Sequence, residues 1–276
     1  MAALEKLDIV KRQPRKNSSY GWFGSYDANI VGGLLIGIGM ATTGACPGTV
    51  LVQLVTGVNS GIFVFLGGLL GGILYSRFGT YLKRSPSTSA PVDTTQHTFQ
   101  TKFNLKPEHV LLAYEGMCLI IIIAASVFGL NGSSPWLHPI FGGALIGSAQ
   151  AASLLLTGNP VGVSGAYGEA GEYFWRFFTS KTARGSRPPV TAMTFALGIM
   201  AGSFALTQYI ATPTKNAEFS RLGAVAGGCA MIFGARLAGG CTSGHGISGM
   251  SSFSISSIIT VAAMFSGGIL TAIITI

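Results

Sequence analysis

Long apolar segments dominate this chain and restrict what it can fold into. Residues 58–76, 109–130, 190–211 and 254–276 are mostly apolar, and each is close to the ~20 residues that an α-helix needs to cross a bilayer. Only 9% of the 276 residues are charged, whereas a soluble domain carries roughly 25%. We therefore expect an all-α integral membrane protein, folded as a polytopic helical bundle.

The basic residues lie almost wholly in the connections between the apolar segments. They gather in the N-terminal segment 1–27 and in two polar loops, 77–107 and 172–189, and the net charge is +8. In a soluble protein this charge could indicate nucleic-acid binding, but here it follows the pattern that sets membrane topology. We expect a cytoplasmic N-terminal segment, a membrane transport domain over 28–276, the lipid bilayer as a partner and no nucleic acid. The crossings number about six, unless an interrupted segment re-enters the membrane.

Three other apolar segments are interrupted by short polar motifs that are rich in glycine. The motifs are GACPGT at 44–49, GNPVGVSG at 158–165 and GGCTSGHGISG at 239–249. Irregular backbone at membrane depth is tolerated only where it is buried in protein or lines an aqueous path. Broken helices in corresponding positions are therefore a sequence signal for a transporter site.

A weak internal repeat supports this interpretation. GGLLIG at 32–37 precedes the first interruption, GGALIG at 142–147 precedes the second, and a Gly-Gly pair at 227–228 precedes the third. Each unit has an apolar, glycine-rich half-segment, a polar break and more apolar chain. The pattern predicts broken or re-entrant helices around a central path.

The first two breaks combine proline with small polar residues. In the first, Pro47 disfavours helix at Cys46, so the thiol is expected where one half-helix ends, with Thr49 in the next. The second offers Asn159 and Ser164 instead of a thiol. A proline kink with a packed cysteine, and a surface turn at the bilayer edge, are the respective alternatives.

The third break carries the densest polar chemistry. Cys241, Thr242, Ser243 and His245 stand between glycines in a stretch that we expect to be unwound. Arg236 lies five residues before Cys241 in an apolar stretch, and an arginine in such a place is a functional candidate. Arg236 could instead snorkel to an interface or hold loop carbonyls.

The breaks contain donors and thiols but no Asp or Glu, which favours an anion over a cation as the substrate. Thiols are polarizable and weak donors, so a sulfur-containing anion fits them better than phosphate. One alternative is a membrane thiol-redox protein that uses Cys46 and Cys241; another is a passive channel. We expect a non-enzymatic transporter with no cofactor and no metal site, since the cysteines and histidines lack zinc spacing.

At these motifs the chain closely resembles the YeeE/YedE family of sulfur-compound transporters. The resemblance rests on GACPGT, GNPVGVSG and the distinctive GARLAGGCTSGHGISG at 234–249, and covers nearly all of the membrane portion. It implies thiosulfate uptake across the plasma membrane, or the bacterial inner membrane, through a compact bundle whose short helices and loops converge on a central path.

The resemblance also implies roles for individual residues. Cys46 and Cys241 match the family motifs and would pass the anion by S–H hydrogen bonding. The predicted path is completed by polar residues of the three breaks, namely Thr49, Asn159, Ser164, Arg236, Thr242, Ser243 and His245. The central break carries no cysteine and Cys118 and Cys229 lie outside the motifs, so a relay of three thiols is not implied. Some family members work with a small sulfur-carrier protein.

Overall fold

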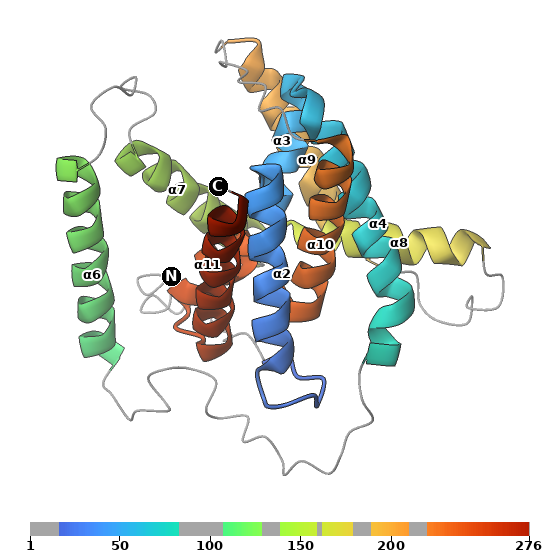
Figure 1. Cartoon of the computed structure of the whole chain (residues 1–276). Coiled ribbons are helices and arrows are strands. Elements are labelled where there is room, and N and C mark those ends of the chain that lie inside the picture. Colours follow the sequence, from blue (N-terminus) through green and yellow to red (C-terminus); the bar gives the residue numbers. More distant parts are fainter. Residues whose placement is uncertain are drawn as a thin grey trace.

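The computed structural model describes residues 17–82, 107–128, 139–158, 162–178, 189–209 and 220–275. The regular elements in these ranges are helices (Figure 1), which confirms the expected all-α class. In chain order they are α2 (Asp27–Thr43), α3 (Pro47–Thr56), α4 (Asn59–Leu82), α6 (Pro107–Phe128), α7 (Pro139–Thr157), α8 (Ser164–Phe178), α9 (Thr191–Thr207), α10 (Arg221–Ala238), the π-helix η3 (Ser243–Gly249) and α11 (Ile255–Thr275).

A central group of long helices forms the core. α10 packs against both α2 and α4, and α2 also packs against α11 (Figure 1). Glycine permits the close approach, because a Cβ on Gly32 would lie 2.6 Å from the carbonyl oxygen of Gly234. Small residues that let backbones approach closely are the usual basis of helix packing in lipid. The shorter α3 and α8 both pack on α4, and α9 packs on α3 and α8.

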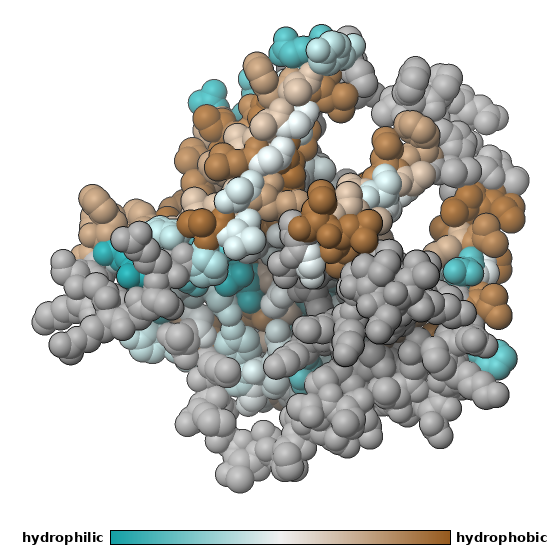
Figure 2. All heavy atoms as spheres, turned by 180° about the vertical axis from the view of Figure 1, so that it is seen from behind, coloured by the Kyte–Doolittle hydropathy of each residue, from teal (hydrophilic) through white to brown (hydrophobic). Residues whose placement is uncertain are grey.

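Four helical segments are long and apolar enough to cross a membrane, by length and composition. They are Asp27–Thr56, Asn59–Gly79, Arg221–Ala238 and Ile255–Thr275, and shorter apolar helices cover Leu112–Ala124, Phe141–Leu156 and Thr191–Thr207. Large apolar side chains are exposed along these helices, and Figure 2 shows apolar residues over much of the coloured part of one face. A surface of this kind suits lipid contact and confirms an integral membrane protein.

The first break is a turn between two helices, as predicted. α2 ends at Gly44, which adopts the left-handed conformation with φ 63°, and α3 begins at Pro47. Glycine accepts positive φ without strain, and proline suits the first position of a helix. Continuous helix is thus interrupted by only three residues, Gly44 to Cys46.

The third break differs from the prediction of unwound backbone. Irregular chain is confined to Gly239, Gly240 and Cys241, after which residues 242–251 are helical and 243–249 form η3. A π-helix has wider turns than an α-helix and often occurs at functional sites. Glycine-rich sequence remains helical here because η3 is packed inside the protein, with Gly244 and Gly249 buried.

Two of the expected polar loops begin later than the sequence suggested. α4 continues to Leu82, into the predicted loop 77–107, and α8 continues to Phe178, into the predicted loop 172–189. In α8 the apolar Phe174, Trp175 and Phe177 alternate with the charges, so the segment remains an amphipathic helix. Residues 83–106 and 179–188 of these loops, Asn159 of the second break and residues 1–16 of the N-terminal segment lie outside the described residues.

Candidate functional site

Cys46 occupies the N-terminal end of α3. It is the N-cap residue, and its Sγ accepts a 3.4 Å hydrogen bond from the backbone N–H of Thr49. In return the backbone N–H of Cys46 donates to the hydroxyl of Thr49 at 2.7 Å. This reciprocal pair is a capping box, so Thr49 fixes the direction of the thiol. The Cys46 side chain remains half-buried.

Cys241 lies in the short irregular stretch between α10 and η3 and is 1% exposed. Its Sγ is 3.2 Å from the hydroxyl oxygen of Ser243. It also hydrogen-bonds with the hydroxyl and the backbone N–H of Ser164, and with the backbone N–H of Gly244. The sulfur is therefore surrounded by hydroxyl and amide donors.

The first and third breaks meet at the N-terminal end of α8. Ser164 is the first residue of α8 and contacts Cys241. The preceding residue, Val163, lies beside the first break, because a Cβ on Gly48 would be 3.6 Å from its Cγ2 and 4.0 Å from the Sγ of Cys46. Both thiols therefore lie near the Val163–Ser164 step.

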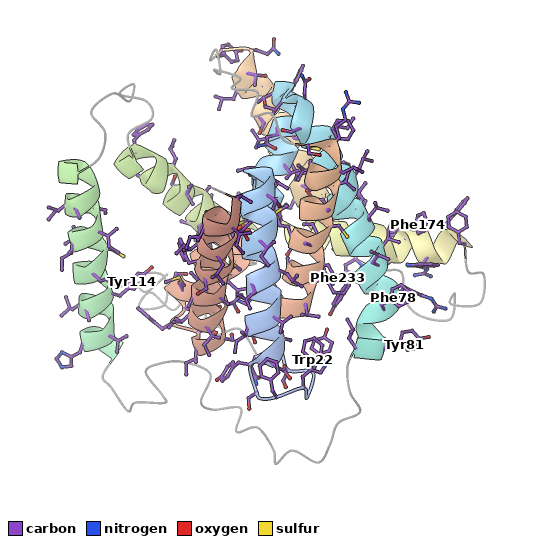
Figure 3. All side chains as sticks on the ribbon, viewed as in Figure 1. Trp22, Phe78, Tyr81, Tyr114, Phe174 and Phe233 are labelled. Carbon is purple, nitrogen blue, oxygen red and sulfur yellow. The ribbon has the colours of Figure 1, made fainter. Side chains whose placement is uncertain are left out.

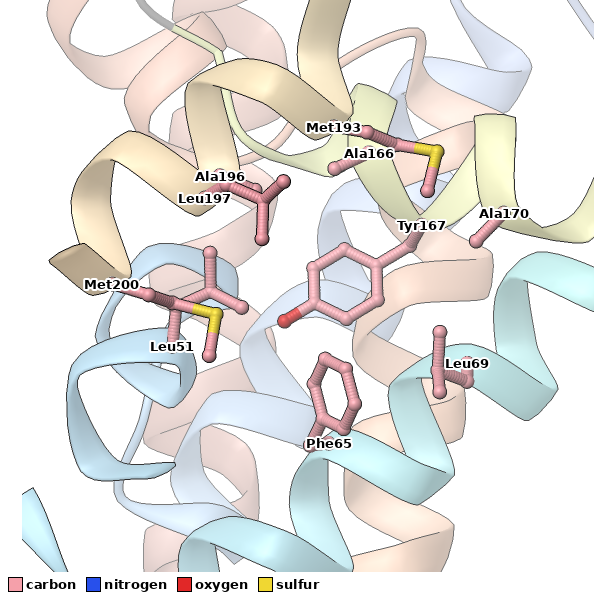
Figure 4. Close-up of a pocket in the computed structure, with 10 residues that line it drawn as sticks. All are labelled: Leu51, Phe65, Leu69, Ala166, Tyr167, Ala170, Met193, Ala196, Leu197 and Met200. Atoms are coloured by element: carbon pink, nitrogen blue, oxygen red, sulfur yellow. The ribbon is translucent and has the colours of Figure 1, made fainter. Parts of the chain in front are cut away.

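Tyr167 connects this region to α3 and was missed by the sequence reasoning. Its hydroxyl donates a 3.1 Å hydrogen bond to the carbonyl oxygen of Pro47. Cys46 and Cys241 both lie close enough to Tyr167 to interact with it electrostatically. Figure 4 shows its ring between Phe65 and Met193, beside an apolar cavity of about 180 Å³. The only sequence signal for Tyr167 was that an aromatic residue stands between two glycines, Gly165 and Gly168, at the end of the second break.

The side chains of His245 and Arg236 have partners other than the thiols, although the backbone N–H of His245 donates to the carbonyl oxygen of Cys241 at 2.8 Å. His245 is 1% exposed, and its ring nitrogens lie 2.9 Å from the Ser257 hydroxyl oxygen and 3.1 Å from the carbonyl oxygen of Ala238. Arg236 directs its guanidinium at Gly168 and over the ring of Tyr75. Thr242 lines an apolar groove between α2 and α11.

Comparison with known proteins decides the family. A family model described as "Sulphur transport" matches residues 1–270. The chain belongs to this sulphur transport family. Two relatives named "Probable transporter", from Xylella fastidiosa strains 9a5c and Temecula1 / ATCC 700964, are each 29% identical over 140 residues. Those residues are 50% of this chain and 94% of each relative.

The protein is thus a membrane transporter of the sulphur transport family, and its described breaks contain donors rather than acids. The N-terminal ends of α3 and α8 lie near the two thiols, and helix N-termini favour negative charge. Glu169 lies one turn after Ser164 but accepts hydrogen bonds from the N–H groups of Ala192 and Met193 at the start of α9. Within the described residues, no group of three His, Cys, Asp or Glu could hold a metal ion.

Proposed function

We propose that this transporter takes up thiosulfate or a related sulfur anion along a path that passes Cys46 and Cys241. The observation that carries the proposal is that both thiols lie near Val163–Ser164, where the first and third breaks meet. Breaks that are far apart in the sequence thus contribute to one region, as expected of a transporter whose site lies between broken helices.

The electrostatics of this region favour an anion. The positive ends of the α3 and α8 dipoles attract negative charge. Neutral thiols add S–H donors and polarizable sulfur. Thiosulfate presents both oxygen and a terminal sulfur, so it can accept hydrogen bonds from hydroxyls and from thiols in succession.

The remaining path residues take different roles in this proposal. Thr49, Ser164 and Ser243 orient the two thiols through the hydrogen bonds described above. Thr242 and Asn159 contribute further polar groups along the path. His245 holds the end of α10 against α11, and Arg236 supplies positive charge on another side of α8.

We further propose the orientation and the partners. The N-terminus faces the cytoplasm in the plasma membrane, because the basic residues gather in the segment before α2 and in the two long loops. A small sulfur-carrier protein on that side would accept the sulfur that the transporter delivers.

Uptake of ³⁵S-thiosulfate by proteoliposomes tests the proposal. Cys46→Ala and Cys241→Ala should each lower the initial rate roughly fivefold or more, because loss of one hydrogen bond to the moving anion costs about 1 kcal/mol. Cys118→Ala is the matched control, since Cys118 lies in α6 outside the breaks, and should transport at the rate of the parent. Unchanged rates in both break variants would contradict the thiol path.

Serine variants separate this function from thiol-redox chemistry. A hydroxyl can still donate a hydrogen bond, so Cys46→Ser and Cys241→Ser should retain part of the uptake. A thiol–disulfide reaction requires sulfur at both positions, and either serine variant would then be inactive. Complete loss in both, with normal folding, would favour the redox alternative.

A further inference from the structure

Arg236 is a positive charge in the last turn of α10, a helix that is long and apolar enough to cross a membrane. Its Nε is buried and has no hydrogen-bond partner among the described residues. Asp27 shares the surroundings of Tyr20 with Arg236, but its carboxylate already accepts hydrogen bonds from the backbone N–H groups of Tyr20, Trp22 and Ala28. The Asp27 charge is thus engaged in holding the chain before α2.

The neighbours of Arg236 shape a place for its guanidinium. The Cζ atom lies 5.6 Å from the ring centroid of Tyr75, and the ring face offsets part of the charge. A Cβ on Gly168 would lie 2.6 Å from both Cζ and Nε, so only glycine leaves this space open. The Tyr75 hydroxyl forms a hydrogen bond with the hydroxyl of Tyr20.

The Nε–H donor of Arg236 has no matching acceptor among the described residues, whereas the two tyrosine hydroxyls bond to each other. A charge at membrane depth is costly and usually marks a functional pathway, and a buried donor with no partner calls for an unseen water or ion. We infer that Arg236, Tyr75 and Tyr20 form a second anion-binding site, selective for an oxyanion, separate from the thiols. This inference rests on the proposed function, because it places a second binding step on the same transport route.

The second site lies on a different side of α8 from the first. Tyr167 directs its hydroxyl to Pro47 beside the thiols, whereas the next residue, Gly168, faces Arg236. Successive residues of an α-helix point about 100° apart. One helix therefore contacts both sites, and an anion that leaves the thiols has a second positive group to bind.

Residues 17–26 close the second site at the end of the bundle where α2 begins. Figure 3 shows Trp22 at this end, below Phe233. The segment is fastened by the Ser18 N–H to Asn29 Oδ1 at 2.8 Å and by the Trp22 indole to the carbonyl oxygen of Leu82 at 3.1 Å. The rings of Trp22 and Tyr20 have centroids 5.5 Å apart, so Trp22 can report on the site.

Trp22 fluorescence gives a direct test. Trp136→Phe and Trp175→Phe leave Trp22 as the only tryptophan in the purified full-length protein. Titration with sodium thiosulfate should give a saturable change in emission that sodium chloride at equal ionic strength does not reproduce. The change should persist when Cys46→Ala and Cys241→Ala are added. Arg236→Gln should weaken the apparent Kd tenfold or more, and Arg236→Lys should restore part of it.

Two milder variants cover a failure of Arg236→Gln to fold. Gly168→Ala displaces the guanidinium without changing charge, and Tyr75→Phe removes a hydroxyl but keeps the ring; each should weaken the apparent Kd severalfold. The second site is overturned if no thiosulfate-specific change occurs, if Gly168→Ala and Tyr75→Phe both titrate like the parent, or if loss of the two thiols abolishes the signal.

The uptake assay separates this result from the proposed function. If the parent protein does not take up thiosulfate but the Trp22 signal saturates and requires Arg236, the second site stands and the transport proposal fails. If uptake occurs and depends on Cys46 and Cys241 while the Trp22 titration is unaffected by the Arg236 substitutions, the second site fails and the transport proposal stands.

Discussion

The hydroxyl of Tyr167 donates a hydrogen bond of 3.1 Å to the carbonyl oxygen of Pro47, which is 120 positions away in the sequence. Pro47 begins α3 directly after Cys46, so this bond ties the helix end that carries one thiol to the helix whose first residue, Ser164, contacts the other. Gly68 and Gly72 of α4 make room for Tyr167, since a Cβ on Gly68 would lie 3.0 Å from its ring.

Tyr167→Phe should lower transport by loosening this link while it keeps the ring that fills the core. Loss of this one hydrogen bond should lower the free energy of unfolding by about 1 kcal/mol. The initial rate of thiosulfate uptake should fall further than in another variant whose free energy of unfolding is lowered by the same amount. Thermal unfolding in detergent and uptake in proteoliposomes measure the two effects. Tyr81→Phe, at a side chain that is 73% exposed, is the control. Uptake equal to the parent would rule out a positioning role for the hydroxyl.

The glycines of the internal repeat should differ in their tolerance to substitution. A Cβ on Gly37 would overlap the carbonyl oxygen of Met264 and lie 2.8 Å from the backbone nitrogen of Gly268, whereas one on Gly147 would meet no atom within 4 Å. Gly37→Ala must therefore push α2 from α11, at a cost of roughly 1–3 kcal/mol.

Melting temperature and yield in detergent check this pair. Gly147→Ala is the matched control, because it occupies the corresponding position of the second repeat and should fold like the parent. Similar destabilisation by both substitutions would show that α7 is packed as tightly as α2.

His245→Ala should reduce stability rather than the affinity for substrate. Removal of the imidazole takes hydrogen bonds from the Ser257 hydroxyl and the buried carbonyl of Ala238, at a cost of about 1–3 kcal/mol. The folded fraction should transport thiosulfate with an unchanged KM. His109→Ala, at an exposed position in α6, controls for loss of a histidine. A raised KM with unchanged melting would instead place His245 on the path.

Asp27→Asn should release the segment before α2. The carboxylate accepts N–H bonds of 2.8 Å from Tyr20 and 2.7 Å from Trp22, and hydrogen bonds to a charged acceptor contribute roughly 1.5–3 kcal/mol each. An amide side chain has one acceptor oxygen, so it cannot replace them all. Hydrogen exchange at these two amides, measured by mass spectrometry, should become faster. Glu172→Gln, at an exposed position, should leave the exchange rates unchanged.

The sequence predicted the class and the breaks correctly where the signal is local. Hydropathy over about twenty residues is enough to identify a span, and a glycine followed by proline is enough to end one helix and start another, as at Gly44 and Pro47. The same local signal failed at η3, because glycine propensity predicted irregular chain and packing inside the protein held it in a helix instead.

Contacts between distant segments could not be predicted in this way. The sequence placed His245 and Arg236 with Cys241 because they share one motif. In the structure the backbone N–H of His245 bonds to the Cys241 carbonyl, while its ring joins the end of α10 to α11, and Arg236 faces Gly168 and Tyr75. Neighbours in sequence point to different sides of a helix, so a motif alone does not define a site.

The sequence by itself determined that the chain is a helical membrane protein with three interruptions, because hydrophobic length and backbone preference are properties of short segments. Only the tertiary structure decided that Cys46 and Cys241 both lie near the start of α8 and that Tyr167 bonds to Pro47. It also decided that Gly37 is enclosed by α11 while Gly147 is open. These relationships depend on which helices pack together, and in lipid that packing is set by the fit of small residues between distant segments.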